Sequence, residues 1–157
     1  MPDDLYHRDV LAWSEHQADL LRRVGRGERV NDIDWDLVAE EIEDVGLSEL
    51  HSVESYLELM LVHLLKIHGW PDSEWVGHWR VEIVAFQSNM QRRFVPSMRR
   101  RIDIDGLYRS ALRQLRLATD QGRGPLPLPQ TCLLSLDDLL SKEPEALEEA
   151  LSAPAGG

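Results

Sequence analysis

The chain has 157 residues, of which 43% are hydrophobic, and a formal net charge of -11 at pH 7. A chain of this length can bury roughly two-thirds of its unfolded surface, so we expect one domain, residues 1–151, with a substantial core. The acidic balance argues against a general binder of nucleic acid or anionic lipid, because both would repel the chain at long range.

Cysteine usage and the N-terminus indicate the compartment. Cys132 is the single cysteine, and residues 1–5 lack the basic start and apolar run of an export signal. The longest apolar run, about 12 residues, is much shorter than the roughly 20 residues that cross a bilayer. We therefore expect a cytoplasmic protein without a membrane span.

The first predicted helix follows a series at helical spacing near the N-terminus. The series consists of Val10, Trp13, Gln17, Leu20, Leu21 and Val24. Asp9 or Asp4 can cap its start, and Gly25 or Gly27 can end it.

A long central helix is predicted next, beginning after Asp34. One stripe continues past Gly46, through Val38, Ile42, Val45, Leu50, Val53, Leu57, Leu61 and Leu64. Glycine costs about 1 kcal/mol relative to alanine inside a helix, so the alternative is a break at Gly46 with Ser48 capping a separate helix. Residues 56–66 are apolar almost all round, which predicts that other parts of the protein surround them.

Residues 68–72 predict a turn, after which Ser73 can cap a third helix that ends before Pro96. Its apolar ridge consists of Trp75, Trp79, Ile83, Phe86, Met90 and Phe94. A fourth helix follows, with an apolar side formed by Met98, Ile102, Tyr108, Ala111, Leu112, Leu115 and Ala118. Residues 105–106 are a potential interruption of that helix.

The remaining segments predict a cover for the bundle. Residues 121–130 are rich in glycine and proline and should form an extended strap. Ser135 and Asp138 form a capping box for a short helix, residues 145–151 can add a last turn or two, and residues 152–157 should be a flexible C-terminal tail. The fold class is therefore all-α: a single-domain helical bundle of about four main helices with a long central helix, a proline-rich strap and short C-terminal helices.

Taken in order, several sequence blocks resemble a bacterial family catalogued as domain of unknown function 29. These blocks are Asp4-Leu5-Tyr6, Asp9 before Trp13, Gln17-Ala18 with Leu20-Leu21, residues 40–46, residues 63–66, Trp79, Pro96-Ser97, Tyr108 with Ala111, Leu128-Pro129, Cys132 and residues 136–140. The resemblance covers about 140 residues and implies an all-helical soluble fold without an established activity. Where members carry a hydroxyl residue, glutamine and arginine near Trp79, this chain has Glu82, Phe86 and Gln87, so the resemblance implies that a polar site there is altered or absent.

An acidic cluster in the central helix gives the first candidate site. Among its carboxylates, Glu41 is placed to reach the interior, while Glu40 and Asp44 share another face. Glu41 and His63 are the catalytic candidates, as a carboxylate and an imidazole that could bind a metal. The alternative is a solvated acidic face with one buried carboxylate paired to an arginine, and a hydrogen-bonded core histidine.

The candidate metal ligands extend to the third helix, where Glu74, His78 and Glu82 recur every four residues. The full set of metal candidates is Glu40, Glu41, Asp44, His63, His78 and Glu82. A solvated ladder of side-chain pairs explains the same spacing. We expect no cofactor, with a divalent metal as the less favoured alternative.

Arginine and tryptophan supply the candidate contacts with partners. Arg99, Arg100 and Arg101, next to Arg92 and Arg93, form the basic concentration of the chain. They could bind phosphates or pair with carboxylates of this chain or of a partner. Trp35 and Trp70, near helix ends, are the tryptophans expected to be exposed, and the others are expected in the core.

Three functions remain open. The leading hypothesis is a protein-protein interaction or structural module that binds another protein or its own copy. The second is a metal-dependent hydrolase that uses Glu41 and His63, and the third is a nucleic-acid accessory protein that uses the arginines. The sequence leaves open whether the protein is an enzyme.

Overall fold

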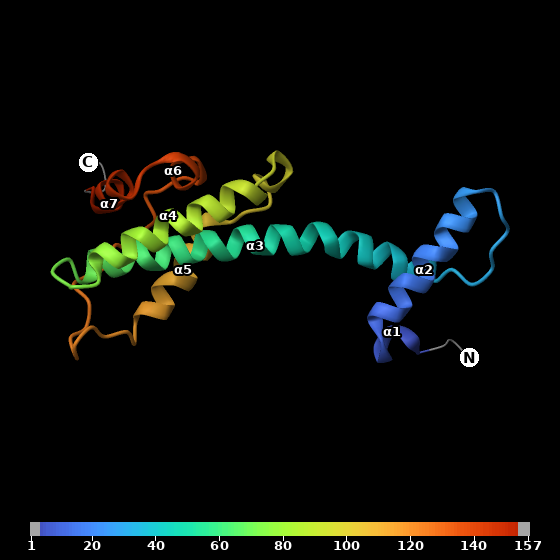
Figure 1. The fold of residues 1–157 in the computed structure, drawn as a ribbon. Coiled ribbons are helices and arrows are strands. Elements are labelled where there is room, and N and C mark those ends of the chain that lie inside the picture. Colours follow the sequence, from blue (N-terminus) through green and yellow to red (C-terminus); the bar gives the residue numbers. More distant parts are fainter. Residues whose placement is uncertain (1–3, 154–157) are drawn as a thin grey trace. The chain divides into compact units, whose positions relative to one another are not determined.

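The computed structural model describes residues 4–153, and its regular secondary structure is helical (Figure 1). No strand lies within that range, so the predicted all-α class is confirmed. Contacts divide the chain into two compact units, Met1–Leu47 and Ser48–Gly157. The prediction of one domain over residues 1–151 stays a prediction.

The first unit begins with α1 (Leu5–Arg8) and α2 (Val10–Gly25). Asp9 caps α2, because its Oδ1 accepts a hydrogen bond of 3.0 Å from the backbone N–H of Ala12. Gly27, two residues beyond the helix, has a φ of +88°, a conformation that glycine adopts without strain. The predicted start and end of this helix are confirmed.

A buried glutamine fixes the loop that leads from α2 into α3. Gln17 lies between Trp13 and Leu20 on the buried side of α2. Its Nε2 donates to the carbonyl of Asp32 at 3.3 Å, and its Oε1 accepts from the backbone N–H of Asp34 at 2.9 Å. Both hydrogen bonds are made to backbone, so Gln17 holds the start of α3 in place.

Helix α3 (Trp35–Gly69) is one continuous helix of 35 residues. The alternative of a break at Gly46 is therefore wrong. The predicted wrapping of its second half is confirmed: Leu57, Met60, Leu61, Leu64 and Leu65 are fully buried. Helix α4 lies along this half (Figure 1).

The first half of α3 differs, because its part of the apolar stripe is exposed. Ile42 is 68% exposed and Val45 is 70% exposed, although their spacing continues into buried Leu50 and Val53. Helical spacing predicts which residues share a face of α3, but it does not predict how far along the helix other elements cover that face.

Helix α4 (Val76–Arg93) buries Trp79, Ile83, Gln87 and Met90. The predicted cap at Ser73 is wrong, because Trp75 occupies the N-cap position. The Ser73 Oγ instead accepts from the Trp75 backbone N–H at 3.2 Å, inside the preceding turn. Trp75 itself is 50% exposed, since its place at the helix start carries it away from the core that the ridge predicts.

The fourth predicted helix is interrupted earlier than expected. A short 3-10 helix, η1 (Pro96–Met98), comes first, and α5 (Ile104–Leu115) begins after a turn. Asp103 caps α5 by accepting from the Gly106 N–H at 3.1 Å. The boundary therefore lies before Asp103, and residues 105–106 belong to the first turn of α5.

Residues 121–130 contain no helix and form the predicted strap. The N–H of Leu126 donates to the carbonyl of Gly69 at 2.9 Å, so the strap crosses the C-terminal end of α3. Tyr108 of α5 donates its hydroxyl to the carbonyl of Pro129 at 2.6 Å, and burial raises the pKa of that hydroxyl. The strap is thus anchored to both helices.

Two short helices complete the second unit: α6 (Leu136–Ser141) and α7 (Pro144–Ser152). The predicted capping box of Ser135 and Asp138 is confirmed at the start of α6. Ser152 still belongs to α7, and residues 154–157 of the predicted tail lie outside the described residues. Across residues 4–153, no helix combines the length and apolar character that crossing a membrane requires.

Candidate functional site

The most unusual exposed feature is the first half of α3. Trp35 is 59% exposed, and Ile42 and Val45 are exposed as well. Three large apolar side chains of this segment are therefore in contact with solvent. At 100° per residue these three positions fall within about 80° of one another, on one side of the helix. We call the exposed side of residues 35–46 the α3 surface.

The same segment of α3 carries several carboxylates on the other sides of the helix. Asp36 and Glu43 lie beyond one edge of the apolar stripe, and Glu40 and Asp44 lie farther round the helix; all four are exposed. Residues 34–46 contain six acidic residues and no lysine or arginine. The α3 surface therefore combines an apolar stripe with a segment that carries acidic residues and no lysine or arginine.

Glu41 has a partner inside the first unit. It is half-buried, and its Oε1 accepts a hydrogen bond of 2.5 Å from the hydroxyl of Tyr6. This bond is the largest cause of the raised pKa of Tyr6. Tyr6 also contacts Trp13 edge-on, with ring centroids 5.0 Å apart. Glu41 thereby links α3 to α1 and to the core of that unit.

His63 is buried in the second unit and has both ring nitrogens occupied. Its Nδ1 lies 2.8 Å from the carbonyl oxygen of Leu59, and its Nε2 lies 2.5 Å from Oε2 of Glu82. The other carboxylate oxygen of Glu82 lies 3.2 Å from Nε2 of His78. Phe86 packs edge-on against the His63 ring, with centroids 5.0 Å apart.

The hydrogen bonds of His63 define where its protons lie. A carbonyl oxygen accepts only, so the Nδ1 of His63 must carry a hydrogen that it donates to Leu59. Nε2 then faces the Glu82 carboxyl group, with Oε2 at 2.5 Å. The arrangement satisfies a buried histidine without any group beyond this chain.

The structure brings together His63, His78 and Glu82 of the metal candidates. In the part of the chain that the structure describes, no group of three His, Cys, Asp or Glu residues could hold a metal ion. Glu41 and His63 stand 22 positions apart on α3, about six helical turns, and each has a local partner. The catalytic and metal assignments stay predictions.

The arginines have divided roles. Arg99 bonds Asp137 at 2.8 Å and lies over the ring of Phe94, and Arg93 bonds both carboxylate oxygens of Glu49 at 3.0 Å. Arg100 and Arg101 are exposed in the turn between η1 and α5. Arg93 and Arg99 therefore pair with carboxylates of the second unit. Pairing with carboxylates was one of the two roles predicted for these arginines.

Of the two tryptophans expected to be exposed, one is exposed and the other is buried. Trp35 is exposed, as predicted, but Trp70 is only 8% exposed. The indole N–H of Trp70 donates to the carbonyl of Arg123 in the strap at 2.9 Å. The prediction for Trp70 is wrong because the strap returns across the end of α3 and covers it.

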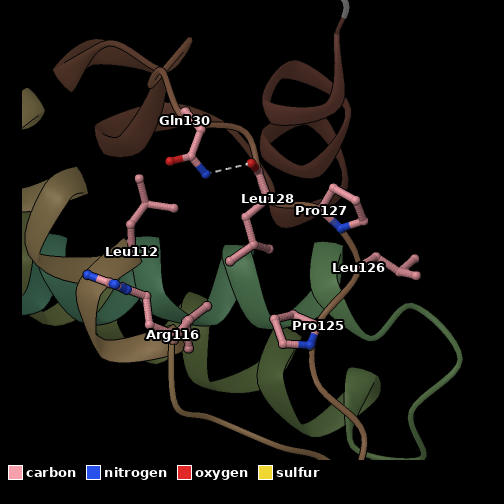
Figure 2. Close-up of a pocket in the computed structure, with 8 residues that line it drawn as sticks. Leu112, Arg116, Pro125, Leu126, Pro127, Leu128 and Gln130 are labelled. Atoms are coloured by element: carbon pink, nitrogen blue, oxygen red, sulfur yellow. Dashed lines mark hydrogen bonds between the residues drawn. The ribbon is translucent and has the colours of Figure 1, made fainter.

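A cavity of about 440 Å³ lies between α5 and the strap (Figure 2). Leu112 and Arg116 come from α5, and residues 125–128 form the opposite wall. In Figure 2 the Arg116 guanidinium extends away from the strap. Arg116 and Gln130 are the polar side chains among the lining residues, and the Gln130 amide donates to the Leu128 carbonyl at 3.0 Å.

Cys132 is partly buried beside this region and has no catalytic surroundings. Its Sγ lies 3.5 Å from the carbonyl oxygen of Leu134, and burial raises the pKa of the thiol. A raised pKa keeps the thiol protonated and therefore poorly nucleophilic. Cys132 is therefore a partly buried free thiol.

The roles of Gln87 and Arg80 in positioning the C-terminal helices were missed by sequence reasoning. Gln87 donates from Nε2 to the carbonyls of Leu139 and Lys142, both at 2.9 Å. Arg80 donates to both carboxylate oxygens of Glu148, at 3.0 and 2.8 Å. The signal for Gln87 was its spacing, four residues after Ile83, which places a polar side chain on the buried face of α4.

Comparison with known proteins places the chain among helical proteins of unknown function. Its sequence is similar to that of an α-helical protein of unknown function from Rhodospirillum rubrum ATCC 11170, solved as a crystal structure at 1.45 Å resolution. The two share 28% identity with a TM-score of 0.66, over 96% of this chain and 99% of the other. No curated protein matches the chain. The family model described as domain of unknown function DUF29 matches residues 5–143, so this chain belongs to the DUF29 family.

Proposed function

We propose that this chain is a protein-protein interaction module and that its partner binds the α3 surface. The observation that carries the proposal is the exposure of Trp35, Ile42 and Val45 on one side of a helix whose second half is mostly buried. Large apolar side chains gathered on one face of a helix favour burial by a partner. Such a role requires no catalytic group.

The α3 surface is also large enough to matter energetically. Burying an isoleucine or valine side chain stabilises a complex by about 1.5–3 kcal/mol, and aromatic side chains dominate many interfaces. Trp35, Ile42 and Val45 could therefore contribute most of the favourable free energy of a moderate-affinity complex. Val81 and Val84 of α4 are exposed at the same spacing as Ile42 and Val45, but the residue seven positions before Val81 is Glu74, so that pair lacks an aromatic neighbour corresponding to Trp35.

The test compares two double substitutions at the same spacing. Ile42→Ser with Val45→Ser removes the apolar stripe, while Val81→Ser with Val84→Ser changes two exposed residues of α4, which are 67% and 43% exposed. The full-length chain and both variants are produced in the native host and isolated under mild conditions, and the bound proteins are identified by mass spectrometry. Light scattering of each purified variant reports self-association.

We expect one partner to be retained by the unchanged chain and by the α4 variant and to be lost by the α3 variant. Both variants should keep the circular dichroism of the unchanged chain, because all four residues are solvent-exposed. Equal retention by the two variants, or no partner with any of them, would contradict the proposal.

A further inference from the structure

We infer that the occupant of the α3 surface is an amphipathic helix of another protein whose apolar stripe is bordered by lysine or arginine. This inference rests on the proposed function and gives the chemistry of the partner. It follows from the spacing of the exposed apolar residues and from the charge around them.

The spacing fits a helix better than any other shape. Trp35, Ile42 and Val45 stand at positions i, i+7 and i+10, which are the a, a and d positions of a heptad. Val38, at the remaining d position, is half-buried. A stripe this narrow spans about three turns, or about 15 Å, and matches the seam along which one helix packs on another.

The negative charge of residues 34–46 favours a basic partner. Asp36 and Glu43 lie beyond one edge of the stripe, and residues 34–46 contain no basic residue that could neutralise them. A partner with acidic borders would bring like charges together, whereas lysine or arginine borders are attracted by the negative potential of this segment. Complementary charge therefore favours a basic helix.

The same reasoning disfavours a second copy of this chain. Packing two α3 surfaces together would place two sets of six acidic residues side by side. The basic segment of a second copy, residues 92–101, is not an amphipathic helix, because it passes from the end of α4 through η1 into a turn. Arg93 and Arg99 in that segment already pair with Glu49 and Asp137.

The experiment uses two designed peptides of about three heptads each, with identical leucines at a and d. One carries lysine at the flanking e and g positions and the other carries glutamate there. Each is labelled with a fluorophore, and its anisotropy is measured during titration with the full-length chain. The titrations are repeated with I42S/V45S, with the matched control V81S/V84S, and with D36N/E43Q.

We expect the lysine peptide to bind and the glutamate peptide to bind at least tenfold more weakly. I42S/V45S should weaken binding of the lysine peptide about tenfold or more, and V81S/V84S should leave it unchanged. D36N/E43Q should weaken it at low ionic strength, and that difference should vanish near 1 M salt, where the Debye length is about 3 Å.

Each other outcome overturns the inference. If the glutamate peptide binds equally well, the basic partner is wrong while an interaction role through the α3 surface stands. If I42S/V45S binds the lysine peptide as tightly as the unchanged chain, the attraction is only the general effect of net charge. Light scattering that shows a dimer abolished by I42S/V45S would instead identify a second copy as the occupant.

Discussion

At the scale of single residues, His63 shows how a buried polar group can be satisfied locally. Its Nδ1 is committed to the Leu59 carbonyl, so its Nε2 depends on Glu82. The Glu82 side chain is 35% exposed and the His63 side chain 8% exposed. The cost of losing this pair should therefore come mainly from the buried imidazole.

Glu82→Leu should lower the free energy of unfolding by about 1–3 kcal/mol, because it leaves the Nε2 of His63 without a partner. Glu82→Gln should cost less, since the amide can donate to the unprotonated Nε2 of a neutral imidazole. His78→Ala, which removes an exposed partner of Glu82, should cost less than about 0.5 kcal/mol. Urea unfolding measures all three, and equal losses for the leucine and glutamine variants would contradict this account.

Asp138 gives a prediction that depends on pH. The backbone N–H of Ser135 and the ammonium of Lys142 bond to its carboxylate and lower its pKa from the ordinary value of 3.8. Because the charged form is favoured in the folded state, its stabilisation is complete above pH 3.8 and is lost as the pH falls through the lower folded pKa.

Asp138→Asn should therefore cost about 1 kcal/mol at pH 7, through weakening of the capping box at the start of α6. The difference from the unchanged chain should shrink steadily as the pH is lowered below 4. Urea unfolding at a series of pH values measures it, with exposed Glu149→Gln as the control. A difference that stays constant down to pH 2 would show that the carboxylate charge contributes nothing.

At the scale of secondary-structure elements, two glycines of α3 have opposite roles. A Cβ added at Gly46 would meet no heavy atom within 4 Å, whereas one at Gly69 would lie 2.7 Å from the Cβ of Pro125. Pro125 is a rigid ring held in the strap, and the next residue donates its N–H to the Gly69 carbonyl. The close approach of strap and helix therefore requires glycine at position 69.

Gly46→Ala should raise the free energy of unfolding by up to about 1 kcal/mol, because alanine is the better helix former and the site is open. Gly69→Ala should lower it by about 1–3 kcal/mol, because the strap must shift to accommodate the methyl group. The two variants carry the same substitution in the same helix, so each is the control for the other in thermal and urea unfolding. Stabilisation by both would show that the strap is not closely packed on α3.

The same elements show what a sequence can predict. Helical spacing predicted that α3 would continue through Gly46, because the apolar series keeps its phase there. It could not predict the burial of Trp70, which depends on a hydrogen bond to Arg123, more than 50 positions away. The start of α5 was missed because Asp103 caps it, a local signal that competes with an apolar series running on from Met98.

The candidate site was only partly predictable for the same physical reason. Trp35 was expected to be exposed from its place near a helix end, and Glu41 was expected to reach the interior. The exposure of Ile42 and Val45 was not predictable, because periodicity does not reveal whether a neighbouring element covers the apolar stripe. The pairing of His63 with Glu82 required knowing that α4 lies along the second half of α3.

At the scale of the whole molecule, charge is unevenly distributed along the chain. Residues 1–47 contain 13 acidic and 5 basic residues, a net charge of -8, whereas residues 48–157 contain 15 acidic and 12 basic residues, a net charge of -3. Most of the negative charge therefore belongs to the unit that carries the α3 surface. A basic partner would be attracted to this unit before any contact forms, and its association rate should fall as salt is added.

The two halves of α3 should also differ in amide hydrogen exchange. Residues 57–67 should exchange at the rate of global unfolding, because their side chains are almost all buried. Residues 36–46 should exchange at least about 100-fold faster, since mostly exposed side chains leave the backbone hydrogen bonds of that segment open to local fraying. Exchange followed by mass spectrometry on the isolated chain measures both halves at once.

Adding the lysine peptide provides the internal control for this exchange measurement. A helix seated on the α3 surface should slow exchange in residues 36–46 and leave residues 57–67 unchanged, because only the first half gains a cover. Equal protection of both halves without peptide, in a sample that light scattering shows to be monomeric, would mean that the first half of α3 is already covered within the molecule. The α3 surface would then be part of the core, and neither the interaction role nor the basic partner would have a surface on which to act.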